Sequence, residues 1–347
     1  MVPGVAVVAV DDQTGQLRRG PILQDAVPSI FIQRGALPTT NPQPLFETTV
    51  PTSELDPVYV HIRDHVHCDE YRQYLGGLWA EYVPYADRNF LDQLQRRGQF
   101  HSRVWEMRLT IVLKRLGLAV AVRGSEAGPD IKIEGTPTTW IEAVAPATTD
   151  ELERSRELAL HGLTPAPEKQ VVLRYTQALA EKWGKYLGYT NAGVVKPSDA
   201  FVIAVNAANL HTPSLGSGPL WIAKALYGIG DLTWSTEVGT GRHLGSGWSH
   251  APMRYKPKGA AVEADLFLSD KRAGISAVLY AADHLKNWPE VRGKIEGSDF
   301  RIFHNEFASV PLPRGLIKRG QEWATGDGML RMLCDHSVAS TDQPASS

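Results

Sequence analysis

The chain has few cysteines, no long apolar run and no marked excess of charge of either sign. Only two of its 347 residues are cysteine, Cys68 and Cys334, and their wide separation excludes a disulfide framework or a Cys-X-X-Cys site. No apolar stretch reaches the ~18 residues that a membrane-spanning helix needs. The apolar opening, Val2 to Val10, is too short for a secretory leader and lacks a basic segment before it. We therefore expect a cytoplasmic protein with no membrane partner.

The composition is that of a globular protein, with 43% hydrophobic and 21% charged residues. Its length predicts one large or two medium domains. A formal net charge of −2 argues against a protein that coats nucleic acid through overall positive charge, so any such contact needs a local basic surface. Three groups of basic residues are candidates for it: Arg96, Arg97 and Arg103; Lys169, Arg174, Lys182 and Lys185; and Arg254, Lys256 and Lys258.

A helix that carries one acidic residue at the border of its apolar face is predicted over 102–116. Its apolar residues recur at helical spacing: Trp105, Leu109, Val112 and Leu116. Ser102 suits the N-cap and Gly117 suits the stop. Glu106 borders the apolar face, so its carboxylate should point along the edge of the core.

A hairpin that follows this helix is predicted to bring two further acids together. After a short strand at 118–122, Pro129-Asp130 opens a strand to 134, and a turn at Gly135-Thr136-Pro137 leads into a second strand at 138–145. A hairpin centred on Thr136 pairs Asp130 with Glu142. Like charges side by side are costly unless a cation joins them, and Mg²⁺ prefers such oxygen ligands.

These three acids, in the order helix, strand, strand, resemble the motif of the PD-(D/E)XK nuclease superfamily, over roughly residues 100–210. The resemblance implies an α/β fold with a restriction-endonuclease-like core, a mixed central sheet flanked by helices. It implies that Asp130, Glu142 and the backbone carbonyl of Ala143 bind Mg²⁺ or Mn²⁺, with Glu106 completing or orienting the shell. The implied activity is metal-dependent hydrolysis of nucleic-acid phosphodiester bonds, with DNA the favoured partner.

The sequence departs from that family at Val144, where the family has a lysine that orients the attacking water. Lys132 is no substitute, because the predicted hairpin sets it opposite Trp140. Lys169 or Lys182, on the next predicted helix, could supply the missing group. Two alternatives stay open: an inactive nuclease-fold protein that binds nucleic acid or another partner, and a metal-dependent enzyme acting on a different phosphoester. The choice between DNA and RNA and the oligomeric state also stay open.

The chain is predicted to have four parts. Residues 1–93 form an N-terminal extension that is irregular, with short strands at 5–10 and 29–33, and helical from Asp56-Pro57 onward. Residues 94–210 form the nuclease-like core, 211–336 a C-terminal α+β extension, and 337–347 a disordered tail. Beyond the hairpin, the core should contain helices at 150–160 and 168–187 and a strand at 200–207. The extension should contain a helix at 219–227 and strands at 264–268, 275–281 and 300–304.

Other patterns favour structural roles. The glycine-rich stretch 239–247 lacks the Gly-Lys-Ser/Thr of a phosphate loop and is predicted to be a flexible loop. A dense group at 61–70 contains three histidines, a cysteine and a glutamate: His61, His65, His67, Cys68 and Glu70. His61 and His65 could share a helix face as metal ligands do, but no third ligand is specified, so we interpret the group as a polar helix face. His304 is interpreted as structural. No Gly-X-Ser-X-Gly elbow is present, which argues against an α/β-hydrolase.

Overall fold

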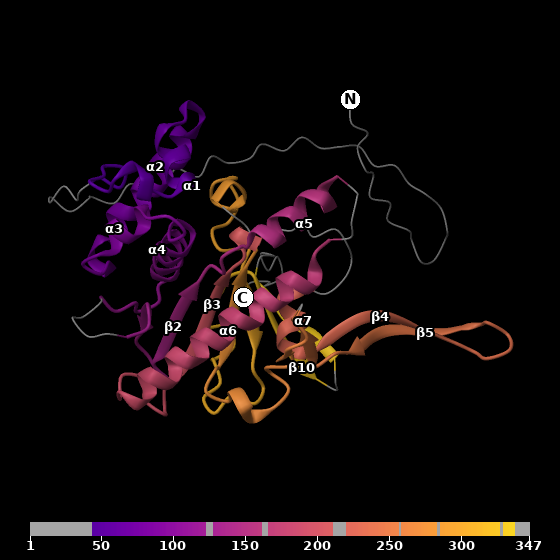
Figure 1. Cartoon of the computed structure of the whole chain (residues 1–347). Helices are drawn as coiled ribbons and strands as arrows, with labels where there is room; N and C mark the ends of the chain where they lie inside the picture. The colour runs from indigo at the N-terminus through magenta and orange to yellow at the C-terminus, as the bar shows by residue number, and fades with distance from the viewer. Residues whose placement is uncertain are drawn as a thin grey trace, which may run out of the picture. The chain divides into compact units, whose positions relative to one another are not determined.

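The computed structural model describes residues 44–122, 128–161, 166–210, 220–256, 258–282, 285–326 and 329–336 (Figure 1). These residues belong to one unit, Pro42–Ser347. The predicted strands at 5–10 and 29–33 and the tail from 337 lie outside the described residues. None of the helices in the described ranges combines the length and the apolar character that crossing a bilayer requires.

A seven-stranded mixed sheet forms the centre of the fold, in the order β1-β2-β3-β8-β9-β10-β11. The strands are β1 (Ile131–Ile133), β2 (Thr139–Val144), β3 (Ala200–Asn206), β8 (Ala277–Ala281), β9 (Arg301–His304), β10 (Gln321–Gly326) and β11 (Met329–Asp335). Neighbours β2, β3 and β8 run parallel, whereas β1 and β9 are antiparallel to their neighbours β2 and β8. The prediction of an α/β fold with a mixed central sheet is confirmed, whereas the restriction-endonuclease-like core stays a prediction.

Helices cover both faces of this sheet. On one face, α4 (Phe100–Arg115) packs against side chains of β3 such as Val202 and Ala204. On the other face, α6 (Glu168–Asn191) packs against the alternate side chains, such as Ile203 (Figure 1). Successive side chains of a strand point to opposite faces, so the nearly continuous apolar sequence of β3 supplies both cores and is buried throughout. Two further helices, α5 (Asp150–Leu160) and α7 (Trp221–Tyr227), lie near α6.

A helical layer precedes the sheet and packs on α4 through its own apolar cluster. It contains α1 (Pro57–Asp64), α2 (Asp69–Tyr82) and α3 (Phe90–Gln95), with short 3₁₀ helices at Thr52–Glu54, Val66–Cys68 and Val83–Tyr85. The Asp56 side chain caps α1 by accepting from Val58 N at 2.8 Å, and Pro57 occupies the first turn. The predicted helical region from Asp56-Pro57 to about residue 94 is confirmed.

Arg108 ties α4 to the segment that follows β8. Its guanidinium is fully buried and forms forked hydrogen bonds with Glu290 and Asp299, at 2.6 to 3.0 Å. It also lies over the ring of Trp288, with 4.4 Å between Cζ and the ring centroid. Because two carboxylates and an aromatic ring surround it, this buried charge is fully compensated.

Several element predictions were wrong in detail. The segment 118–122 forms an isolated bridge, Val120 to Ile133, rather than a strand. Ser102 is not the N-cap of α4, which begins at Phe100 and has no side-chain cap. Residues 264–268 are not a strand; β7 (Ala261–Glu263) ends just before them and pairs with β6 (Met253–Tyr255). Strands β10 and β11 were not predicted at all.

The glycine-rich stretch is also not a simple loop. Residues from His243 onward belong to β5 (His243–His250), which pairs with β4 (Ile229–Thr236) in a two-stranded sheet of its own (Figure 1). Glycine lowers strand propensity, but pairing with β4 supplies the hydrogen bonds that local sequence does not predict. Three further 3₁₀ helices complete the described elements: Ala208–Leu210, Asp270–Arg272 and Leu285–Asn287.

Candidate active site

The β1–β2 hairpin lies at one edge of the central sheet. Its register pairs Ile131 with Ile141 and Lys132 with Trp140, as the turn at Thr136 predicts. The paired positions end at Ile131, so the predicted pair of Asp130 and Glu142 lies just beyond the last of them. Strand β1 has three residues and β2 has six, so the last part of β2 has no backbone partner on this edge. The Asp130 carboxylate fills the gap: its Oδ2 accepts a hydrogen bond from Ala143 N at 2.7 Å.

Glu142 is almost completely buried, with 1% of its surface exposed, and it is bound by side chains from α6. Lys182 Nζ lies 2.9 Å and Lys185 Nζ 2.8 Å from Glu142 Oε1. The Tyr189 hydroxyl donates to Oε2 at 3.1 Å. Successive spacings of three and four residues put these donors on one face of the helix. Lys185 and Tyr189 were not predicted from the sequence as contacts of Glu142.

Glu106 extends from α4 toward the same edge and is 3% exposed. Its Oε1 accepts from the Tyr82 hydroxyl at 2.8 Å, and its Oε2 accepts from Arg103 Nη1 at 2.7 Å. Arg103 also contacts Asp87, at 3.4 Å, and Gln93. Arg103, three residues before Glu106, could have been found from helical spacing, whereas Tyr82 comes from a different helix and carries no such signal.

The three acids line one pocket of about 380 Å³. It lies at the sheet edge, between α4 and α6, which cover opposite faces. Its charged lining consists of four cationic side chains, Arg103, Arg174, Lys182 and Lys185, and four acidic ones, Glu106, Asp130, Glu142 and Glu181. Ala143 and Val144 also line it.

Of the two lysines considered as substitutes for the missing one, the structure brings only Lys182 to the pocket. Lys169 is exposed near the start of α6 and does not line the pocket. The two lysines lie about 20 Å apart along the helix, because each residue advances an α-helix by about 1.5 Å.

The two hairpin acids have opposite electrostatic environments. Burial, together with the Glu106 and Glu142 carboxylates, raises the pKa of Asp130 from 3.8 to about 8, despite the Ala143 N–H and the Lys182 charge. Burial also acts on Glu142, but the ammonium groups of Lys182 and Lys185 outweigh it and lower the pKa of Glu142 below 4.5. A cation bound beside Asp130 would lower the pKa of this carboxyl group and favour its ionised form.

The donor set fits a hard divalent cation. Asp130, Glu142 and the carbonyl of Ala143 offer oxygen ligands, as Mg²⁺ and Mn²⁺ prefer. Within the described residues, Asp130 accepts a hydrogen bond from Ala143 N and forms no ion pair. Glu142 would have to release one of its present donors. Lys185 is the donor that a cation could replace, because 46% of its side chain is exposed and its ammonium group can turn into solvent.

His304 lies in a separate buried cluster. Its Nε2 is 3.0 Å from Glu322 Oε2, and His336 Nε2 lies 3.0 Å from the other oxygen of the same carboxylate. The sequence reading missed Glu322 as the partner, because it lies on β10, which was not predicted. The structural role assigned to His304 from the sequence stays a prediction.

In comparisons with known proteins, the chain matches no family model, no curated protein and no solved structure. A functional assignment therefore depends on the residues of the pocket.

Proposed function

We propose that this protein is a Mg²⁺- or Mn²⁺-dependent nuclease of the PD-(D/E)XK type, with Lys182 in the role of the lysine that Val144 replaces. The observation that supports this most directly is the 2.9 Å contact between Lys182 Nζ and Glu142 in the pocket that Glu106 and Asp130 also line. An ammonium group therefore lies beside the acidic residues of the hairpin, although Val144 occupies the motif position at which the family has its lysine.

Each polar side chain then has a defined task. Asp130, Glu142 and the Ala143 carbonyl would hold the cation, which lowers the pKa of bound water and balances charge on a phosphate. Lys182, held by Glu142, would orient the attacking water and offset the negative charge that develops on the phosphate. Arg103 holds the Glu106 side chain in place through a 2.7 Å ion pair, so that this carboxylate can orient the shell.

The cationic side chains at the rim suit a phosphodiester substrate. Arg174 donates through Nε to the Ala147 carbonyl at 2.8 Å, which positions its guanidinium beside the pocket. Lys185, released from Glu142 by the cation, could contact a phosphate oxygen. A pocket of about 380 Å³ admits one phosphodiester unit and its flanking groups. We favour DNA as the substrate.

The test is cleavage of single- and double-stranded DNA and RNA by purified protein, with Mg²⁺ or Mn²⁺ or with a chelator. Metal-dependent cleavage is expected, and Glu142→Gln should abolish it. Lys182→Met should lower the rate by about 100-fold or more, the typical effect of losing one preorganised electrostatic contact. Lys169→Met is the matched control on the same helix and should keep the wild-type rate. Equal rates for the Lys182 and Lys169 variants would contradict the role given to Lys182.

A second candidate function is a nuclease-fold protein without activity that binds nucleic acid. It is favoured by Val144 and by the hydrogen bonds that already satisfy Glu142 and Glu106. Binding without cleavage, unaffected by chelator and weakened by salt because basic side chains displace counterions, would support it. A metal-dependent activity on small phosphoesters, with no action on any nucleic acid, would support the other alternative, an enzyme for a different phosphoester.

A further inference from the structure

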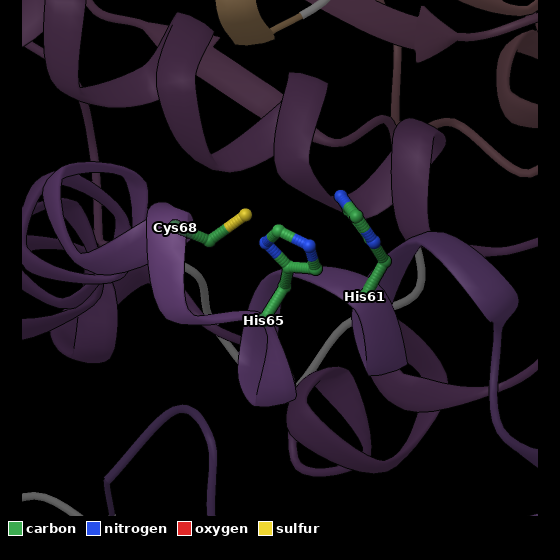
Figure 2. Close-up of side chains that lie close together, drawn as sticks. All are labelled: His61, His65 and Cys68. Carbon is green, nitrogen blue, oxygen red and sulfur yellow. The ribbon is translucent and has the colours of Figure 1, made fainter.

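A second group of potential metal ligands lies in the helical layer. His61 is in the last turn of α1, His65 directly follows that helix, and Cys68 ends the 3₁₀ helix Val66–Cys68. One potential ligand atom from each residue lies within 4.8 Å of the other two. Figure 2 shows the His65 ring between the Cys68 thiol and the His61 ring. The two imidazole centroids are 4.7 Å apart.

This geometry corrects the interpretation of these residues as a polar helix face. Helix α1 ends at Asp64, so His65 is outside the helix. The chain turns there, which carries Cys68 back toward His61 as the third member of the group. The helical spacing of four residues had identified the two histidines but left the third ligand unspecified.

The turn that carries the group is held in place by α2. Arg72 Nη1 donates to three carbonyl oxygens of the turn: Ile62 at 2.7 Å, His65 at 2.9 Å and Arg63 at 3.1 Å. Cys68 is 3% exposed and belongs to the apolar cluster of the helical layer. The backbone and the thiol are therefore ordered, while the two histidines are exposed and can rotate.

The ligand chemistry selects the class of metal. Two imidazole nitrogens and one thiol sulfur, without a carboxylate, suit Zn²⁺ and similar transition-metal ions and do not suit Mg²⁺. In the described part of the chain, no further histidine, cysteine or acid joins the group. Three protein ligands at an exposed position leave the fourth tetrahedral place to water.

We propose that His61, His65 and Cys68 form a binding site for a Zn²⁺-class ion, separate from the acidic pocket. Tetrahedral coordination requires donor atoms roughly 3.3–3.5 Å apart, given Zn–N near 2.0 Å and Zn–S near 2.3 Å. Small rotations of the exposed histidines achieve this closure. Binding releases the Cys68 thiol proton to solvent and forms the metal–sulfur bond. It also displaces the hydrogen bond from His67 N to His65 Nδ1, whose length of 3.3 Å makes it weak.

The experiment uses the full chain carrying Cys334→Ser, stripped of metal with a chelator, so that Cys68 is the only thiol. Zn²⁺ is titrated by calorimetry, and the rate of Cys68 alkylation is measured with and without it. We expect one Zn²⁺ per chain and strong protection of the thiol. Co²⁺ should give the thiolate charge-transfer absorption and the intense visible bands of a tetrahedral site.

His61→Ala and Cys68→Ser should each weaken Zn²⁺ binding by more than about 100-fold, since losing a ligand costs more than losing a supporting contact. His67→Ala, the matched control, should bind as the parent does. Asp130→Asn should also retain the site, because it alters the other pocket. No Zn²⁺ binding by the parent, or unchanged binding in His61→Ala, would overturn the proposal. His61 is exposed, so its variant is informative even if Cys68→Ser folds poorly.

Discussion

The substitution Asp130→Asn should stabilise the metal-free protein and abolish its response to Mg²⁺. An asparagine at this position can still accept the hydrogen bond from Ala143 N through its side-chain oxygen. It removes only the charge that Glu106, Glu142 and burial disfavour. A residue whose charge costs stability but binds a cation is typical of an active site.

The size of this stabilisation and its pH dependence follow from the pKa of Asp130, which folding raises from 3.8 to about 8. Between these values the unfolded chain is ionised while the folded protein keeps its proton, so wild-type stability falls as the pH rises. Each pKa unit corresponds to about 1.4 kcal/mol, but Asp130 is only partly buried, and solvent screening reduces the total to on the order of 2–3 kcal/mol. The free energy of unfolding of Asp130→Asn should therefore exceed that of wild type only slightly near pH 5 and by the full amount near pH 9.

The assay is thermal or urea denaturation near pH 5 and near pH 9, with chelator or with excess Mg²⁺. At the higher pH with chelator, Asp130→Asn should melt roughly 5 °C above wild type. Excess Mg²⁺ should raise the melting temperature of wild type and leave that of the variant unchanged, because the variant lacks one carboxylate of the proposed metal site. Glu134→Gln, at an exposed acid of the same hairpin, is the control and should show neither effect.

Two results would refute this reasoning. One is a loss of stability in Asp130→Asn near pH 9, which would mean that the charge supports the fold. The other is an equal Mg²⁺ response in both proteins, which would remove Asp130 from the proposed metal site.

Arg108→Ala should destabilise the fold by about 3–5 kcal/mol in urea denaturation, because it leaves the largely buried carboxylates of Glu290 and Asp299 without their cationic partner. Arg115→Ala, which breaks two solvent-accessible ion pairs of the same helix, should cost about 1 kcal/mol or less, and similar losses would contradict the burial argument. Gly320→Ala should reduce stability by about 3 kcal/mol or prevent folding, because φ is +64° and a Cβ would lie 2.0 Å from the Phe300 carbonyl oxygen. Gly315→Ala has a similar φ of +70° but open space around it, so thermal melting should show a smaller loss, and an equal loss would disprove the steric explanation.

The sequence alone determined the parts of the site that depend on local periodicity. The turn around Thr136 fixes the register of β1 and β2, because side chains alternate along a strand and one paired position sets all the others. Sequence periodicity predicted the helices observed as α4 and α6 and placed Glu106 at the border of an apolar face. The nearly continuous apolar sequence at 200–207 indicated a strand, as a strand covered on both faces requires.

Tertiary structure decided what the local pattern left open. Only packing of α6 across the sheet distinguishes Lys182 from Lys169, since both suit the same helix. Tyr82 reaches Glu106 from another helix, and β5 forms in a glycine-rich stretch because β4 pairs with it. The end of α1 before His65, in a turn that Arg72 contacts from α2, brings Cys68 close to His61 and His65. These contacts join residues far apart in the chain, or depend on where an element ends, and neither is encoded in a short window of sequence.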